Sequence, residues 1–311
     1  MELIEEIKQI RKPYKNSVIT IGNFDGVHKG HQALFKEAIN KASSIGGTSL
    51  AVTFDPHPLK ILRPDKTPPL ITLYEQKVEL IAQTGLDVLI CIKFTKEFSE
   101  VTAKEFLEDI LIKRLGMKAI IVGNDYHFGK NREGNIDFLQ SFSKIFNFEL
   151  IIPSWINVAQ NKPDRISSTR IRDFVSNGNI EESKNLLGRY YQIRGFVEEG
   201  RKRGKELLGI PTANIRLSDE LCPKIGVYAV IVELDGNKYK GVANIGYSPT
   251  FTDNVFTVEV HILDFDKDIY GKKIYVNFVS QLREEKKFTS LSDLSAQIKK
   301  DIQSANELLS L

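Results

Sequence analysis

Short apolar runs alternate with amphipathic segments along the first half of the chain. The runs are rich in β-branched residues, and the segments between them repeat apolar side chains every three to four residues, as amphipathic helices do. This alternation predicts βα units stacked on a parallel sheet. The predicted strands are Val18 to Ile21, Leu50 to Phe54, Val88 to Phe94, Ala119 to Val122 and Phe148 to Ile152.

Apolar stripes predict helices over residues 34–42 and 106–111 of this half. Two helix starts have the spacing of a capping box, at Thr72 to Glu75 and at Thr102 to Glu105. Residues 1–15 are also patterned as an amphipathic helix. They lack the uninterrupted apolar core and the small-residue cleavage site of a secretory signal, so we expect a cytoplasmic protein.

After residue 189 the pattern changes to closely spaced strands. Asp235-Gly236 lies between two of them and predicts a tight hairpin, because both positions tolerate the positive φ of a primed turn. A helix follows with apolar residues at 291, 294, 298 and 302, behind a Ser or Thr cap. This half is predicted to form a small antiparallel barrel closed by a helix. The predicted strands are Tyr191 to Val197, Val227 to Glu233, Tyr239 to Ile245, Phe256 to Leu263 and Ile274 to Val279.

Between the two patterns, Ser167 to Gly188 is predicted to form two short helices that end at Gly178 and Gly188. We therefore expect an α/β domain over residues 1–185 and an all-β domain over residues 186–311. The full length of 311 residues suits two domains of ordinary size.

Composition narrows the classes of function. Apolar residues make up 41% of the chain and charged residues 27%, and no apolar stretch is long enough for a membrane span. The charges of the 43 basic and 40 acidic residues nearly cancel, so we expect no nucleic-acid partner. Small anionic ligands remain compatible with this charge balance. Cys91 and Cys222 show no metal-ligand spacing and are expected to be small core residues.

The stretch GNFDGVHKGH, residues 22–31, lies where the first predicted strand passes into the first predicted helix. In open α/β sheets, ligands bind beyond the carboxyl ends of the strands. Gly22 and Gly26 allow a tight turn, Gly30 allows a ligand to approach the backbone, and the helix N-terminus favours a phosphate. His28 and His31 are three residues apart and share a face of the first helical turn. Phosphate binding is one interpretation, and an ordinary loop with glycines and histidines is the other.

The segment HKGH resembles the H-x-G-H signature of the nucleotidyltransferase superfamily, and GNFDGVHKGH is similar to the form found in bacterial FAD synthetases. FDPHP at residues 54–58, VGNDYHFG at 122–129 and ISSTRIR at 166–172 follow in the order of that family. The resemblance implies a Rossmann-like domain in which His28 and His31 hold the phosphates of ATP and stabilise the transition state. The other site residues that it implies are Gly22, Asn23, Phe24, Asp25, Gly30, Phe54, Pro56, His57, Pro58, Asp125, Ser167, Ser168, Thr169 and Arg172.

The resemblance also implies a separate role for each group of these residues. Asn23 and Asp25 shape the ATP pocket, Asp125 lies beside the nucleotide, residues 54–58 help to wall the flavin site, and residues 167–172 form a second phosphate clamp. The residues themselves also allow plainer roles, which are a helix N-cap for Ser167 or Ser168 and a turn for Asn124 and Asp125. We assign no role to His127.

Residues 200–205, GRKRGK, look like a P-loop but have three residues between the glycines and Glu206 after the lysine, so we reject that interpretation. The following GIPTANI, residues 209–215, resembles the P-T-A-N motif of riboflavin kinases. Further segments match the same family in order; they are GVYAV at 226–230, GVANIGYSPTF at 241–251, VEVHILDFD at 258–266 and LREEKKF at 282–288.

This second resemblance implies that Thr212 and Asn214 bind Mg²⁺ and ATP phosphates next to Gly209 and Pro211. It further implies that Glu259 is the general base for the riboflavin 5′-hydroxyl. Strand alternation places Glu259 on the face opposite the apolar residues. Plainer roles stay open here too: Glu259 as a solvent-facing strand residue, and Thr212 and Asn214 as turn residues.

Together the two resemblances cover nearly the whole chain and imply a bifunctional enzyme. Riboflavin is phosphorylated to FMN in the C-terminal barrel, and FMN is adenylylated to FAD in the N-terminal domain, each step with ATP and Mg²⁺. A chain in which one module is weak is a narrower alternative. A flavin- or nucleotide-sensing protein without catalysis is the rival from another class, and Glu259 argues against it because a pure binder needs no base.

Overall fold

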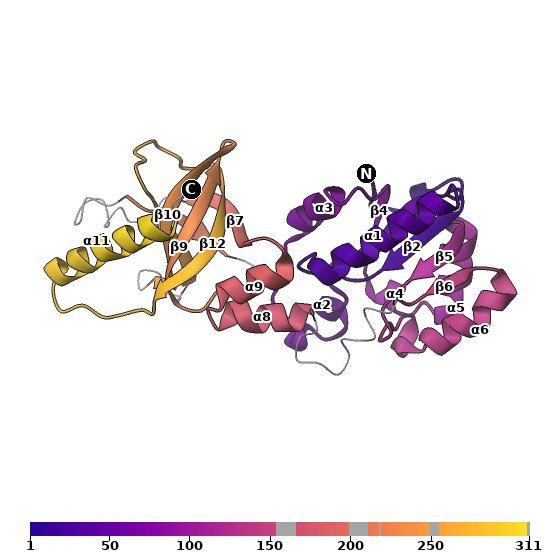
Figure 1. Cartoon of the computed structure of the whole chain (residues 1–311). Helices are drawn as coiled ribbons and strands as arrows, with labels where there is room; N and C mark the ends of the chain where they lie inside the picture. Colours follow the sequence, from indigo (N-terminus) through magenta and orange to yellow (C-terminus); the bar gives the residue numbers. More distant parts are fainter. Residues whose placement is uncertain (154–165, 199–210, 218, 249–254, 310–311) are drawn as a thin grey trace. The chain divides into compact units, whose positions relative to one another are not determined.

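The computed structural model describes residues 1–153, 166–198, 211–217, 219–248 and 255–309. The chain divides into two compact units, residues 1–167 and residues 168–311. In Figure 1 the first unit runs from indigo to magenta and the second from pink to yellow. The first is built on an open parallel sheet and the second on a closed barrel, as the sequence predicts.

The sheet of the first unit has the strand order β1-β4-β3-β2-β5-β6, and every neighbouring pair is parallel. From β2 the chain moves outward through β3 and β4, and it then returns to the other side of β2 with β5 and β6. The carboxyl ends of β2 and β5 therefore lie at the point where the strand order reverses, which is where such sheets bind ligands. The strands are β1 (Glu2–Ile4), β2 (Ser17–Ile21), β3 (Ser49–Asp55), β4 (Val88–Lys93), β5 (Met117–Ile121) and β6 (Glu149–Ile151).

Helices cover both faces of this sheet. Consecutive residues of β3 belong to different buried clusters: Ala51 packs with Phe35 of α1, whereas Leu50 packs with Leu107 of η3. Burial on both faces explains the continuous apolar runs of the central strands. The helices among the described residues of this unit are η1 (Ile7–Gln9), α1 (Lys29–Ser44), α2 (Pro58–Leu62), η2 (Pro64–Lys66), α3 (Tyr74–Ala82), α4 (Lys96–Ser99), α5 (Ala103–Glu105), η3 (Phe106–Arg114), η4 (Lys130–Arg132) and α6 (Ile136–Phe146).

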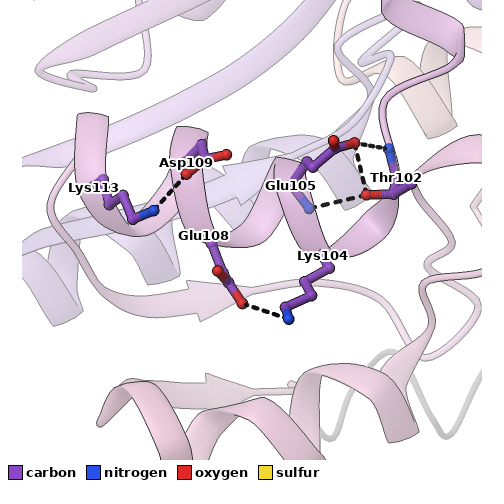
Figure 2. A network of polar contacts seen from close by, with 6 residues as sticks. All are labelled: Thr102, Lys104, Glu105, Glu108, Asp109 and Lys113. Carbon is purple, nitrogen blue, oxygen red and sulfur yellow. Dashed lines mark hydrogen bonds and ion pairs between the residues drawn. The ribbon is translucent and has the colours of Figure 1, made fainter.

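The predicted capping box at Thr102 is confirmed. The Thr102 hydroxyl accepts from the Glu105 backbone N–H at 3.2 Å, and the Glu105 carboxylate accepts from the Thr102 N–H at 2.9 Å, as Figure 2 shows. The predicted helix continues from this start, but residues 106–114 form a π-helix. Lys113 pairs with Asp109 at 2.6 Å on its exposed side (Figure 2).

Two predictions for this unit are wrong. Residues 1–15 do not form an amphipathic helix, because Glu2–Ile4 pairs in parallel with β4 as an edge strand and only Ile7–Gln9 is helical. Thr72 does not cap α3, which begins at Tyr74 behind Leu73. The Thr72 hydroxyl instead accepts from the backbone N–H of Gly26 at 3.0 Å, so a tertiary contact replaces the local cap.

The second unit is a closed antiparallel barrel with the strand order β10-β11-β8-β7-β12-β9, followed by a helix (Figure 1). Asp235 and Gly236 join β9 to β10 with φ values of 49° and 79°, which confirms the predicted hairpin. Ser290 caps α11 by accepting from the backbone N–H of Asp293 at 3.1 Å, which confirms the predicted helix start. The strands are β7 (Tyr191–Glu198), β8 (Ala213–Arg216), β9 (Gly226–Leu234), β10 (Asn237–Ser248), β11 (Val255–Ile262) and β12 (Lys273–Arg283).

Within the described residues, this unit has three helices: α8 (Ser168–Ser176), α9 (Ile180–Leu187) and α11 (Leu291–Leu308). Gly178 and Gly188 follow α8 and α9 with φ values of 81° and 77°, as predicted for helix ends. The backbone N–H of Lys224 donates to the carbonyl of Val175 in α8 at 3.2 Å, so α8 is tied to the segment that leads into β9.

Candidate functional sites

The GNFDG turn follows β2 and is held by Asp25. The buried carboxylate of Asp25 accepts from the backbone N–H groups of Ile71 and Thr72, each at 3.0 Å. Phe24 and Val27 are both buried and have φ values of 49° and 40°. Bulky or β-branched residues in the left-handed region are strained, and they persist only where the surroundings fix them. Tertiary contacts therefore hold the turn in place, and the Asp25 carboxylate provides two of them.

His28 and His31 lie together at the start of α1, as predicted from their spacing. His28 is the N-cap of the helix, and its Nδ1 accepts from the backbone N–H of His31 at 3.3 Å. The two rings are stacked, with centroids 3.5 Å apart and planes 16° apart. A Cβ on Gly30 would lie 3.1 Å from Cε1 of His28, so the glycine leaves room for this ring, whereas the sequence suggested room for a ligand.

Asn23 and His57 connect the turns that follow β2 and β3. The Asn23 side-chain amide lies 3.2 Å from Nε2 of His57. His57 is the N-cap of α2, and its Nδ1 accepts from the backbone N–H of Leu59 at 3.2 Å. The GNFDG and DPHP motifs thus meet through their side chains.

The rest of the FDPHP motif leads from β3 into α2. Phe54 lies near the end of β3, and its half-buried ring packs with Phe94 and Phe98 at centroid distances of 5.8 and 6.1 Å. Pro56 follows a cis peptide bond, and Pro58 is the first residue of α2.

Asp125 lies in the loop that follows β5, on the other side of the switch point. The residue is exposed, and its backbone carbonyl accepts from Nδ1 of His127 at 2.9 Å. The same loop packs against the start of α5, where a Cβ on Gly129 would lie 2.5 Å from the backbone nitrogen of Ala103.

The ISSTRIR motif begins beside the histidine pair. A Cβ on Gly30 would lie 3.9 Å from Cγ2 of Ile166, the first residue of that motif. Ser167 ends the first unit, while Ser168, Thr169 and Arg172 lie in the first turns of α8 in the second unit.

In the barrel, Glu259 lies in a row of polar residues that crosses three strands. Asn214 of β8 and Asn244 of β10 are its register partners on either side. Paired residues of an antiparallel sheet share a face. Val258 and Val260 are fully buried inside the barrel, so Glu259 points outward, as alternation predicts. Burial nevertheless raises the pKa of the Glu259 carboxyl above its ordinary value.

The P-T-A-N segment is held against this row. Nδ1 of His261 donates to the backbone carbonyl of Pro211 at 2.8 Å, and Thr212 follows directly before β8. Asn214 lies within β8, so the turn that the sequence also allowed for it is wrong. Gly209 and the segment GRKRGK at 200–205 lie outside the described residues.

Two family models match the chain, one described as FAD synthetase over residues 10–170 and one described as riboflavin kinase over residues 187–309. A protein of Buchnera aphidicola subsp. Acyrthosiphon pisum named bifunctional riboflavin kinase/FMN adenylyltransferase is 39% identical, over 97% of this chain and 96% of its own length. The protein of the same name from Escherichia coli K12 is 36% identical over 100% of this chain and 99% of its own. The chain belongs to the bifunctional riboflavin kinase/FMN adenylyltransferase family.

A solved structure described as a macrolide-efflux protein from Streptococcus pneumoniae is also similar, with a TM-score of 0.85 and 34% identity over 98% of each chain. That structure supports the fold. Within the described residues of the present chain, no helix is long and apolar enough to cross a membrane.

The first unit thus contains the FMN adenylyltransferase module and the second contains the riboflavin kinase module. Both are transferases that use ATP and a flavin. Sequence reasoning missed Asn244, although its motif GVANIG was recognised, because the register that places it beside Glu259 is a tertiary feature. It also missed Thr53 and Lys77, which no motif includes. Thr53 donates to the backbone carbonyl of Asn23, and Lys77 donates to Thr53 and to the backbone carbonyl of Phe54.

Proposed function

We propose that the histidine pair of the adenylyltransferase module binds the phosphates of ATP and stabilises the charge that develops during transfer. The helix N-terminus adds backbone donors and a positive dipole end to the two imidazoles. Ser167, Ser168, Thr169 and Arg172 supply a second clamp on the phosphates. In this reaction the phosphate of FMN attacks the α-phosphorus of ATP and displaces pyrophosphate. Because the nucleophile is already an anion, alignment and charge stabilisation suffice and no general base is needed.

The flavin side of this module is proposed to lie along the turns after β2 and β3. Asn23 and His57 fix the two turns to each other, and Phe54, Pro56 and Pro58 form the adjoining wall. Asp125, exposed on the loop after β5, is proposed to lie beside the nucleotide. Gly22, Phe24, Asp25 and Gly30 support these groups by shaping the turn.

In the kinase module we propose that Glu259 is the general base. The riboflavin 5′-hydroxyl must lose a proton in order to attack the γ-phosphorus of ATP, and a carboxylate with a raised pKa is a stronger acceptor than an ordinary one. The observation that carries this proposal is the register pair of Asn214 and Glu259, which joins two motifs 45 residues apart in sequence (259 − 214).

Thr212 and Asn214 are proposed to hold Mg²⁺ together with the phosphates of ATP, next to Pro211 and Gly209. A hydroxyl and an amide oxygen two residues apart are hard oxygen donors of the kind that Mg²⁺ prefers. Magnesium usually takes only one or two protein ligands and completes its shell with phosphates and water. When bound, the ion would neutralise charge on the transferred phosphoryl group.

The test is incubation of the whole protein with riboflavin and ATP, with and without Mg²⁺, followed by chromatographic separation of the flavins. We expect FMN and FAD with Mg²⁺ and neither after chelation. Absence of both products from folded protein in the presence of Mg²⁺ would contradict the proposal. FMN formation that persists after thorough chelation would contradict the magnesium role alone.

The domain boundary at residues 185 and 186 is also a proposal. The family models support it, since one ends at residue 170 and the other begins at 187, whereas the division by contacts falls at 167 and 168. Limited proteolysis of the full chain tests it, with cleavage expected at the end of α9, within residues 185–190. The cytoplasmic location and the absence of a nucleic-acid partner stay predictions.

A further inference from the structure

Lys77 is a buried lysine that contacts the carboxyl end of β3. It lies on α3, and only 7% of its surface is exposed. Its Nζ donates to the backbone carbonyl of Phe54 at 3.2 Å and to the hydroxyl of Thr53 at 3.4 Å. Both acceptors belong to the last residues of β3, where the chain enters the DPHP turn.

A chain of hydrogen bonds leads from Lys77 to the turn after β2. The Thr53 hydroxyl, which accepts from Lys77, donates to the backbone carbonyl of Asn23 at 3.2 Å. The side chain of Asn23 in turn meets Nε2 of His57. One ammonium group thus reaches the carboxyl end of β3 directly and the GNFDG turn through a single side chain.

Two carboxylates near Lys77 favour its charged ammonium form, and burial opposes it. Burial lowers the pKa of Lys77, while the nearby Asp25 and Asp55 act against that shift. Cys91 is the other titratable group that acts on it, and burial raises the pKa of this thiol, which favours its neutral form. A buried ammonium is costly unless hydrogen bonds and opposite charges compensate for it. An apolar side chain could fill the same space but would leave the two acceptors of β3 without this donor.

We propose that Lys77 is a positioning residue for FMN adenylylation, which sets the relative placement of the Asn23 and His57 turns through Thr53 and the Phe54 carbonyl. The inference rests on the proposed role of these turns in the adenylyltransferase site. A small displacement of groups that orient a substrate lowers the rate of the bound complex strongly, because the reacting atoms need close alignment. Loss of Lys77 should therefore act mainly on kcat.

The experiment compares full-length Lys77→Met with the wild type. Met retains an unbranched apolar chain but removes the charge and the donors. FAD formation from supplied FMN and FMN formation from riboflavin are measured separately on each protein. FMN formation reports the amount of active kinase module, and circular dichroism with thermal unfolding shows whether the first unit is folded. Lys144→Met serves as the matched control, since Lys144 is an exposed lysine of α6 and its loss removes the same charge.

We expect kcat for FAD formation in Lys77→Met to fall about 10- to 100-fold, with KM for FMN within about threefold and FMN formation unchanged. Lys144→Met should match the wild type in both reactions. Thr53→Val keeps the shape of the side chain but breaks the link to Asn23, and it should lower the same kcat. The double variant Lys77→Met/Thr53→Val should be no slower than Lys77→Met, because the effects of substitutions at partners in one network are not additive.

Wild-type kcat for FAD formation in folded Lys77→Met would overturn the inference. A double variant whose fold-reduction in kcat equals the product of the two single-variant reductions would also overturn it. If Lys77→Met fails to fold, Thr53→Val decides: a lowered kcat with intact FMN formation supports the inference, and wild-type FAD formation overturns it. Failure of the proposed site is distinguished by Asn23→Ala and His57→Ala. Wild-type FAD formation in those two variants would contradict the role of the turns themselves.

Discussion

His28 and His31 stack with their ring planes 16° apart and their centroids 3.5 Å apart, and both rings belong to the first turn of α1. The pair presents two imidazoles at a helix N-terminus, beyond the strand where the order of the sheet reverses. This arrangement can act on one phosphate group from one side.

Replacement of His31 by Ala should lower FAD formation from FMN by about 10²-fold or more, the usual scale for a group that stabilises transition-state charge. FMN formation from riboflavin should be unaffected, because it takes place in the other module. Separate assays of the two reactions on the same preparation provide both the test and its control. Normal FAD formation in this variant would remove the phosphate role argued for the pair.

Replacement of Glu259 by Gln should suppress FMN formation by about 10²-fold or more, the scale for losing a general base. FAD formation from supplied FMN should persist. Glu181→Gln, on the exposed first turn of α9, is the matched control and should be active in both reactions. Loss of both activities in Glu259→Gln would speak against separate sites.

The pH dependence of the kinase step should report the raised pKa of Glu259. A protonated carboxyl cannot accept the proton of riboflavin, so the rate should decline as pH falls through this pKa. The decline should lie above the ordinary glutamate value of about 4.3. A rate profile of FMN formation with an acidic limb at or below that value would contradict the assignment.

The same residue should show a conflict between stability and activity. Because the folded state binds the Glu259 proton more tightly than the unfolded chain, stability falls as pH rises from the ordinary pKa through the raised one. Gln removes this penalty. We expect Glu259→Gln to have the higher Tm at pH 7 and the difference to vanish near pH 4, measured by calorimetry. A lower Tm for the variant at pH 7 would contradict the account of burial.

Asp25 should be mainly a structural residue. Its replacement by Ala would leave the backbone N–H groups of Ile71 and Thr72 without their carboxylate acceptor. An unsatisfied buried group costs about 1–3 kcal/mol, so we expect the first unit to lose about 2–5 kcal/mol of unfolding free energy in denaturant titrations. Asp25→Asn retains one acceptor oxygen and should lose less. Equal stability of Asp25→Ala and the wild type would show that the turn does not depend on this anchor.

Arg283 and Asp301 fasten α11 to the end of β12. Nε of Arg283 donates to both carboxylate oxygens of Asp301 at 3.0 Å, and the Asp301 side chain is only 6% exposed. Arg283→Met leaves the buried carboxylate without its cation, with the Gln297 side-chain amide still donating to it at 2.9 Å. We expect a loss of about 3–5 kcal/mol of unfolding free energy. The double variant Arg283→Met/Asp301→Leu should recover most of it. A double variant as unstable as the single one would show that the pair is not the cause.

The sequence predicts the elements whose signals are local. The continuous apolar runs of β2 to β4 follow from burial on both faces, and Asp235-Gly236 supplies the positive φ of its own turn. The alternation around Glu259 is likewise enough to place the carboxylate outside the barrel.

The missed features all depend on partners far along the chain. Thr72 has the local spacing of a cap but bonds to Gly26, 46 residues away. The segment Glu2–Ile4 has only three residues, one of them charged, and only pairing with β4 makes it a strand. Lys77 looks like an exposed helical lysine in sequence, and its burial follows only from how α3 packs on the sheet.

The most direct test of two separate sites on one chain is a mixing experiment with Glu259→Gln and His31→Ala. Each variant is incubated alone, and then with the other, in riboflavin and Mg-ATP, and the flavins are separated by chromatography. We predict that His31→Ala accumulates FMN, that Glu259→Gln makes almost no flavin nucleotide, and that the mixture makes FAD. A mixture of folded variants that makes no FAD, while His31→Ala releases FMN, would contradict the account.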